Sequence, residues 1–337
     1  MLAGVIEKKG HLALQDREIP VLTAEDQVKL KVEAASICGT DVHILADPPG
    51  HPSALGIIQG HEFTGEVVET GSAVQHVRAG DRVVVDPTTT CGFCYYCQIG
   101  EQNLCEDSST IGIFMNGGWA PYSVIPAKNV HKISKTVSPD VAVFAEPLSC
   151  VINGVSKLDM QLGNSVVILG AGPMGQLFTQ VMKASGVGVI ICVDLSDYRL
   201  GYSQVSGATH VLNPKKENVA SFVKRLTGAG ADIVIDCAGA LFDQSLNLVR
   251  KGGQVLLVGM NEHANPSIKQ YDITRNEIAV KGTFIQKCDF PRVVRTLEAN
   301  LLDLKGLITH RLPLSKVHEG VEAMRKGEAL KVILYPE

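Results

Sequence analysis

Four of the chain's nine cysteines lie within the stretch CGFCYYCQIGEQNLC, at Cys91, Cys94, Cys97 and Cys105. Zinc in structural sites takes about four thiolate or imidazole ligands. The two short gaps let the chain curl around one ion, and the longer arm returns to close the shell. An iron–sulfur cluster also takes four cysteines, and C-x-x-C pairs can be redox-active, but the rest of the chain favours zinc. A full thiolate shell leaves no open position for catalysis.

A second set of possible metal ligands is dispersed along the first half of the chain. SICGTDVH contains Cys38 and His43, QGHEFTGEVVETGSAV contains His61 and Glu62, and FAEPLSC contains Glu146. Each residue alone has an ordinary structural explanation, as a core thiol, a loop pair or a turn. Together they offer a thiolate, imidazole and two carboxylates. A catalytic zinc needs about three protein ligands and one open position, so this set could form one.

The segment VVILGAGPMG places three glycines directly after a predicted strand and at the start of a predicted helix. In this context Gly170 permits the turn, Gly172 allows a pyrophosphate to approach, and Gly175 lets the helix pack on the strand. Asp194 ends the next strand, about 20 residues on, where an acid binds a ribose 2′-hydroxyl. That acid favours NAD over NADP, although Arg199 could pair with a phosphate. The predicted cofactor-binding residues are Gly170, Gly172, Pro173, Met174, Gly175, Asp194 and Arg199.

The elements that position these residues change character near residue 150. Before it, short β-branched runs such as QVKLKVEAAS and DRVVVDP alternate with Gly, Pro and Asp, which is typical of a strand-rich, barrel-like domain. After it, apolar strands such as SVVILG and ADIVIDCAG alternate with helical segments. Such alternation predicts an α/β fold with a doubly wound parallel sheet covered on both faces. The final run, KVILYP, predicts a strand that returns to the first domain.

Length and charge restrict the class of protein. The 337 residues suggest two domains, and the net charge of −4 gives no electrostatic argument for nucleic acid or an anionic membrane. We see no apolar run long enough to cross a bilayer and no signal-peptide pattern at the N-terminus. We therefore expect a cytoplasmic protein, in which clustered cysteines bind metal more often than they form disulfides.

Taken together, these motifs make the sequence similar to the zinc-dependent medium-chain dehydrogenases, in the polyol dehydrogenase branch of the alcohol dehydrogenase superfamily. The four-cysteine lobe, the GAGPMG turn and Asp194 match that family in the right order. The family signature G-H-E-x2-G-x5-G-x2-V falls on Gly60, His61, Glu62, Gly65, Gly71 and Val74.

The resemblance implies a domain organisation. It gives a GroES-like catalytic domain at 1–149 with a structural zinc lobe at 88–108, a Rossmann NAD-binding domain at 150–284, and a C-terminal segment at 285–337 that rejoins the catalytic domain. It also implies NAD, two zinc ions per chain and a homodimer or homotetramer that acts on a small molecule.

Site roles follow from the same resemblance. Cys38 and His61 would ligate the catalytic zinc, with Glu62 as a ligand or near neighbour and Glu146 acting on the metal directly or through water. Thr40 and His43 would pass the substrate proton to solvent before hydride moves to the nicotinamide. A non-enzymatic zinc- and nucleotide-binding protein is the alternative from another class. The intact ligands and glycines argue against it.

The substrate is less defined by the sequence. AEPLSC resembles the polyol dehydrogenases, including those that act on sugar-alcohol phosphates, and predicts oxidation of a secondary alcohol of a sugar alcohol, polyol phosphate or cyclitol. The segments ICGTDVHI and KVHEGVEAMRKGEALKVIL resemble threonine 3-dehydrogenase about as well. Sorbitol dehydrogenases carry an Arg-Tyr pair where this chain has Ile285 and Gln286, which argues against sorbitol itself. Lys287 or Arg292 could meet a substrate phosphate, although solvated surface cations are the more ordinary interpretation.

Overall fold

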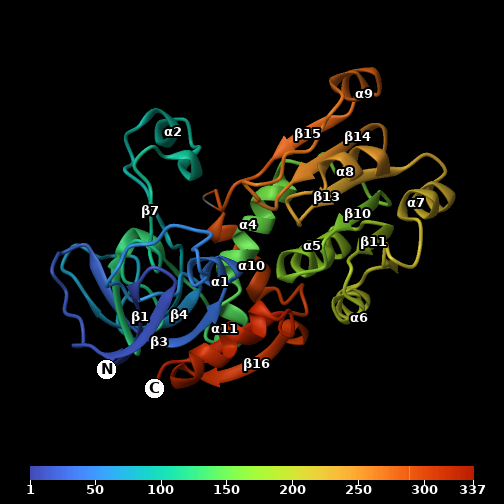
Figure 1. Cartoon of the computed structure of the whole chain (residues 1–337). Coiled ribbons are helices and arrows are strands. Elements are labelled where there is room, and N and C mark those ends of the chain that lie inside the picture. Colours follow the sequence, from blue (N-terminus) through green and yellow to red (C-terminus); the bar gives the residue numbers. More distant parts are fainter. Residues whose placement is uncertain (288) are drawn as a thin grey trace. The chain divides into compact units, whose positions relative to one another are not determined.

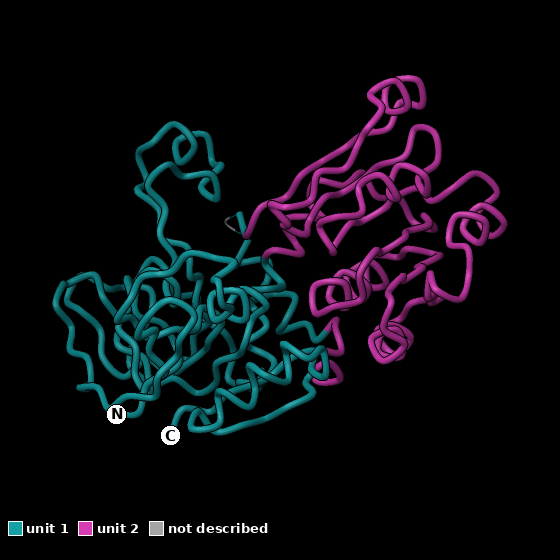
Figure 2. Tube along the Cα trace, viewed as in Figure 1, with its two compact units in different colours: residues 1–149, 286–300, 308–337 teal, residues 150–285, 301–307 magenta. Residues whose placement is uncertain are grey.

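The computed structural model describes residues 1–287 and 289–337, and these form two compact units. The first unit contains residues 1–149, 286–300 and 308–337, and the second contains residues 150–285 and 301–307 (Figure 2). The division falls inside helix α4 (Ala145–Ser156). No helix among the described residues is both long and apolar enough to cross a membrane.

The first unit is built on a curved sheet of order β16-β17-β3-β4-β5-β9, with β8 also paired to β3. Along β3 buried and less buried residues alternate over much of the strand, because one face packs on the core. The core includes Trp119, Ile6 and Leu30. The strands are β3 (Gln27–Ile37), β4 (Phe63–Thr70), β5 (Arg82–Val85), β8 (Tyr122–Pro126), β9 (Val130–Lys132), β16 (Ile308–Pro313) and β17 (Lys331–Tyr335).

Smaller elements complete this unit. A hairpin of β1 (Leu2–Lys8) and β2 (His11–Asp16) lies at the N-terminus, and β6 (Thr88–Thr89) pairs with β7 (Ser109–Thr110). The chain between β6 and β7 forms a separate lobe that carries α2 (Figure 1). The remaining helices are α1 (Gly39–Ile44), α2 (Tyr95–Gln98), α3 (Pro139–Ala142), α10 (Phe290–Glu298) and α11 (Val317–Arg325), with 3₁₀ turns at Gln102–Leu104, Ala127–Asn129 and Leu314–Lys316.

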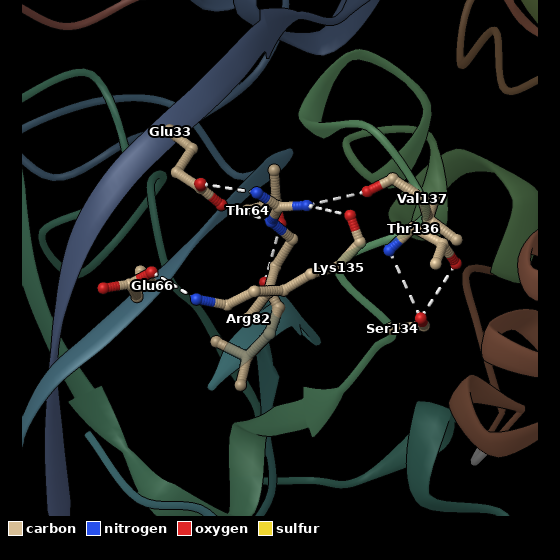
Figure 3. A network of polar contacts seen from close by, with 9 residues as sticks. Glu33, Thr64, Glu66, Arg82, Ser134, Lys135, Thr136 and Val137 are labelled. Atoms are coloured by element: carbon tan, nitrogen blue, oxygen red, sulfur yellow. Dashed lines mark hydrogen bonds and ion pairs between the residues drawn. The ribbon is translucent and has the colours of Figure 1, made fainter. Parts of the chain in front are cut away.

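A network of polar contacts connects β5 to other parts of the first unit (Figure 3). Arg82 on β5 donates from Nε and Nη2 to the two carboxylate oxygens of Glu33 on β3, at 2.6 and 2.7 Å. Its Nη1 donates to the backbone oxygens of Lys135 and Val137, just after β9. Lys135 in turn forms an ion pair with Glu66 of β4. A bidentate, partly buried guanidinium–carboxylate pair is among the stronger polar contacts, so Arg82 joins β5 to β3 and to the segment that follows β9.

The second unit has a six-stranded parallel sheet of order β12-β11-β10-β13-β14-β15. Its central strand β10 is buried along its whole length, as expected where helices cover both faces. The predicted fold class is confirmed. The elements are β10 (Ser165–Leu169), α5 (Pro173–Ala184), β11 (Val189–Val193), α6 (Asp197–Ser206), β12 (His210–Leu212), α7 (Val219–Thr227), β13 (Ala231–Asp236), α8 (Phe242–Leu248), β14 (Val249–Leu257), α9 (Gln270–Arg275) and β15 (Ala279–Gly282), with a 3₁₀ turn at Lys305–Leu307.

Candidate active site

Cys38 stands at the junction of β3 and α1, where it is the residue before the first helical turn. Its backbone N–H donates to the carboxylate of Asp41 at 2.8 Å, which closes the start of the helix. Asp41 is completely buried. The half-buried Cys38 thiol is therefore fixed by a short helix that a buried acid holds in place.

His61 and Glu62 directly precede β4, which pairs antiparallel with β3. That pairing brings them beside Cys38, although they lie 23 and 24 positions further along the chain. Gly60 has φ +98°, and a Cβ there would lie 2.2 Å from the Trp119 ring, so only glycine fits this turn. The donor atoms of Cys38, His61 and Glu62 all lie within 4.8 Å of one another.

Buried charge surrounds these three donors. His61 Nδ1 lies 3.5 Å from Asp41 Oδ1, and the same oxygen accepts a hydrogen bond from Gln59 at 2.9 Å. Burial and the Glu62 carboxylate raise the pKa of Cys38. Burial alone would lower the pKa of His61, but the Asp41 and Cys38 charges raise it well above its usual value. A thiol, an imidazole and a carboxylate at this spacing match the ligands zinc prefers, with Asp41 placed to orient His61.

The other predicted residues of this site lie on two helices. Glu146 is in the first turn of α4 and is 9% exposed. It is not part of the three-donor group, and its backbone oxygen accepts the Ser149 hydroxyl at 2.5 Å. Thr40 and His43 lie on α1, Thr40 half-buried and His43 exposed. The structure thus gathers Cys38, His61 and Glu62, and it carries Thr40 and His43 on the same short helix that follows Cys38.

The four-cysteine lobe brings all four sulfur atoms within 4.8 Å of one another. Cys91 Sγ lies 3.5 Å from Cys105 Sγ and 4.0 Å from Cys97 Sγ, well beyond a disulfide bond. Backbone N–H groups of Cys97 and Glu106 lower the pKa of Cys94 to about 6. Such N–H contacts stabilise thiolates, and four converging thiolates fit a closed zinc site.

The glycine turn of the second unit has the geometry of a phosphate-binding loop. Gly170 has φ +96°, and a Cβ on Gly175 would lie 2.0 Å from the Gly170 carbonyl oxygen. Gly172 precedes α5, and a Cβ there would meet nothing within 4 Å. The space at Gly172 is therefore open, at the N-terminus of a helix whose amides and dipole attract anions. Pro173 and Met174 are half-buried in the first turn.

Asp194 follows β11 and is held beside this loop. Its Oδ2 accepts the Ala171 N–H at 2.7 Å, and its Oδ1 accepts the Ser196 N–H at 2.8 Å. Arg199 lies one turn into α6. Its Nε is buried without a hydrogen-bond partner among the residues that the structure describes. A carboxylate and a guanidinium thus both lie near where the ribose of a dinucleotide would bind.

Several contacts were not predicted from the sequence. Gln286 is 3% exposed and donates to Asp86 at 2.6 Å and to Thr88, so it is directed into the first unit. Lys287 forms an ion pair with Glu101, and Arg292 lies 3.5 Å from Asp289. The spacing of Asp41, three residues after Cys38, is a local signal that could have been recognised as a helix cap. Partners from distant parts of the chain leave no such signal.

Comparisons with known proteins agree with this geometry. Residues 24–135 match the alcohol dehydrogenase GroES-like domain, and residues 173–299 match the zinc-binding dehydrogenase domain. The chain is 36% identical to an L-threonine 3-dehydrogenase of Caldanaerobacter subterraneus subsp. tengcongensis, covering 95% of this chain and 94% of that protein. It is 34% identical to a sorbitol dehydrogenase of Halalkalibacterium halodurans, covering 97% and 96%.

Two solved structures are similar over nearly the whole chain. A zinc-binding dehydrogenase of Sinorhizobium meliloti 1021 bound to NADP has a TM-score of 0.94 and 32% identity, covering 99% of both chains. An alcohol dehydrogenase of E. coli CFT073 complexed with NADH has a TM-score of 0.91 and 31% identity, also covering 99% of both. The resemblance inferred from the motifs is confirmed: this chain belongs to the family of zinc-binding, NAD(P)-linked alcohol dehydrogenases.

Proposed function

We propose that this chain oxidises a secondary alcohol of a sugar alcohol, polyol phosphate or cyclitol to a ketone, reversibly and with NAD. The observation that supports it best is the group formed by the half-buried Cys38 and the buried His61 and Glu62. Such a donor set belongs to a catalytic rather than a structural zinc, because it leaves a coordination position open.

In this proposal the chain's own residues bind the metal and move the proton. Cys38, His61 and Glu62 hold the ion, Glu146 acts on it directly or through water, and Asp41 orients the imidazole. The bound zinc supplies Lewis acidity, which favours loss of the hydroxyl proton from the substrate. Thr40 and the exposed His43 carry that proton toward solvent, and histidine suits this role because its ordinary pKa is near neutral.

The proposed cofactor preference rests on Asp194. Two backbone N–H groups fix its carboxylate beside the glycine loop, where it would accept ribose hydroxyls and repel a 2′-phosphate. We therefore propose NAD as the working cofactor, although a similar structure holds NADP. Arg199, with its unpartnered Nε, is the residue that would favour a 2′-phosphate.

A threonine-type amino alcohol is the second candidate substrate, favoured by the 36% identity to an L-threonine 3-dehydrogenase. A panel of polyols, polyol phosphates, cyclitols and L-threonine, followed by NADH absorbance, separates the two. The polyol proposal expects the highest kcat/KM on a polyol-type substrate. The highest value on L-threonine would overturn it in favour of the amino alcohol.

The metal assignment has its own test. Cys38→Ser should abolish turnover and lower the zinc content from about two ions per chain to about one. Cys237→Ser, a cysteine of the second unit, is the matched control and should keep both ions. Full turnover in the Cys38→Ser protein would refute the assignment.

We also propose a cytoplasmic homodimer or homotetramer. The structure describes eight cysteines and joins none of them in a disulfide bond, which fits a reducing compartment. Strand β15 ends the parallel sheet, pairs only with β14 among the described residues, and leaves Val280 37% exposed. An open, apolar strand edge favours pairing with a second chain. Sedimentation of the purified protein tests this, and a monomer would refute it.

A further inference from the structure

Lys331 is a buried lysine beside the proposed metal site. It lies on β17, its residue is 4% exposed, and its Nζ donates a hydrogen bond to Glu62 Oε2. The hydroxyl of Ser36 donates to the same oxygen. The Phe144 ring lies 5.1 Å from the ammonium and covers it on another side. Lysine is almost never buried to this extent without a partner, and Glu62 is that partner.

The strands fix this arrangement independently of the side chains. In the sheet register Ile333 of β17 lies opposite Ser36 of β3. The Ser36 N–H also donates to the Glu62 backbone oxygen at 2.9 Å. Glu62 is therefore tied to Ser36 by both backbone and side chain, and Lys331 reaches it from the next strand. Its other oxygen, Oε1, is the one not engaged by Lys331 or Ser36.

We propose that Lys331 is a positioning residue that limits how far Glu62 engages the catalytic metal. This rests on the proposed metal site. By holding Oε2, Lys331 and Ser36 leave only Oε1 to turn toward an ion bound by Cys38 and His61, so a coordination position stays open for substrate. The lysine also adds one positive charge next to two anionic ligands. That charge offsets part of the negative charge of the ligands and of the buried Asp41 carboxylate, which helps the metal polarise a hydroxyl.

Removing the ammonium should release the carboxylate onto the metal. In Lys331→Met, Glu62 Oε2 loses its ion pair and keeps only the neutral hydrogen bond from Ser36, which is too weak to hold it away from the metal. The metal then gains a ligand and loses its open position. We expect kcat/KM to fall roughly 10- to 100-fold, the range typical of partners that orient metal ligands. We expect cobalt placed in this site to give weaker d–d bands, the signature of a higher coordination number. Lys331→Arg should keep the charge and restore the parent spectrum.

The experiment uses the full chain with cobalt exchanged into the Cys38–His61–Glu62 site and zinc kept in the four-cysteine lobe. Lys281→Met is the matched control, because Lys281 is also partly buried but its Nζ donates to two neutral oxygens in the second unit. In the Lys331→Met/Glu62→Gln double variant the strong bands should return, since no carboxylate remains to take the extra position. The double variant also removes the unpaired buried charge if the single variant folds poorly.

The outcomes separate the two proposals. If Lys331→Met has the same cobalt spectrum and kcat/KM as Lys281→Met, the role of Lys331 is overturned while the metal site stands. Weak bands that persist in the double variant would also overturn it. If no cobalt band of the parent protein is lost in Cys38→Ser, the proposed metal site is refuted. The inference about Lys331 is then refuted with it.

Discussion

Asp86 shows how one half-buried side chain can oppose folding at neutral pH. Burial raises its pKa to about 6, although the N–H groups of Thr88 and Gln286 counteract part of that rise. Both donors bind the same oxygen, Oδ1, at 2.9 and 2.6 Å. Two hydrogen bonds at one oxygen do not offset the cost of removing the charged carboxylate from water. An asparagine oriented with its carbonyl at Oδ1 would keep both hydrogen bonds and carry no charge.

Asp86→Asn is therefore expected to stabilise the protein above pH 6. The folded pKa lies above the unfolded value of about 4, so the folded state binds more protons between pH 4 and 6. Ionisation of Asp86 therefore lowers the free energy of unfolding of the parent protein as the pH rises through that window. A shift of about two pKa units corresponds to a gain of up to about 3 kcal/mol for the variant. Urea unfolding at several pH values measures this gain.

The difference between the two proteins should shrink toward zero below about pH 4, where Asp86 is neutral in both states. A difference in the free energy of unfolding that does not change with pH would mean that packing, and not the ionisation of Asp86, distinguishes the two proteins. Burial lowers the pKa of His131 to about 4, but this group is present in both proteins and cancels in the comparison.

We propose that Asp194 selects between NAD and NADP. Asp194→Ser removes the acceptor for ribose hydroxyls and the charge that repels a 2′-phosphate, while Arg199 remains. We expect kcat/KM with NAD to fall and the ratio of NADP to NAD use to rise by at least about tenfold, or about 1.4 kcal/mol. Steady-state kinetics with both cofactors measure this ratio. An unchanged ratio would show that another residue selects the cofactor.

At the scale of single elements, substitutions of two glycines in the turn between β10 and α5 can distinguish an effect on folding from an effect on cofactor binding. Gly175→Ala would place a Cβ 2.0 Å from the Gly170 oxygen, so α5 must move off the sheet. We expect it to lower the free energy of unfolding by about 2 kcal/mol or more and to abolish NADH binding.

Gly172→Ala is the matched variant, since its Cβ meets no atom within 4 Å. It should change stability by only about 1 kcal/mol at most yet weaken NADH binding, because the methyl group occupies the approach of the pyrophosphate. NADH fluorescence titration and thermal unfolding of both variants test the pair. Tight NADH binding by Gly172→Ala would place the pyrophosphate elsewhere.

The elements themselves were largely predictable from the sequence. Apolar runs such as SVVILG and ADIVIDCAG alternate with helical segments, and they became β10 and β13 of a parallel sheet. The run KVILYP became β17, which pairs with β3. These predictions succeeded because hydrophobic period and glycine position act locally. The pairing of Lys331 with Glu62, or of Gln286 with Asp86, could not be predicted, since the partners are about 200 or more residues apart.

At the scale of the whole molecule, the first unit is assembled from three separate stretches of chain. Its sheet joins β3 and β4 from the N-terminal part with β17 from the C-terminal end. The candidate metal site depends on that closure, because Glu62 is held by Lys331 of the last strand. Some candidate catalytic residues lie close together in the sequence, but Lys331, which contacts Glu62, comes from the last strand. The surroundings of the site are therefore complete only when β17 joins the sheet.

We expect the four-cysteine lobe to contribute to the stability of the whole molecule rather than to its chemistry. It is joined to the rest of its unit by the short β6–β7 pair (Figure 1). It contains little regular structure beyond α2 and a 3₁₀ turn. A lobe of this kind depends on its ligated ion for a defined shape. Phe93 and Tyr95, 74% and 66% exposed, would lose their fixed positions without it.

Cys94→Ser should therefore reduce zinc to about one ion per chain and destabilise the protein by more than about 2 kcal/mol. Activity should fall only as folded protein or assembly is lost. Zinc analysis, thermal unfolding and sedimentation are measured together, and turnover is expressed per folded chain. Cys38→Ser provides the contrast, with turnover lost while the lobe keeps its ion. A Cys94→Ser protein that keeps its fold and both zinc ions yet loses turnover would place the lobe in the catalytic machinery instead.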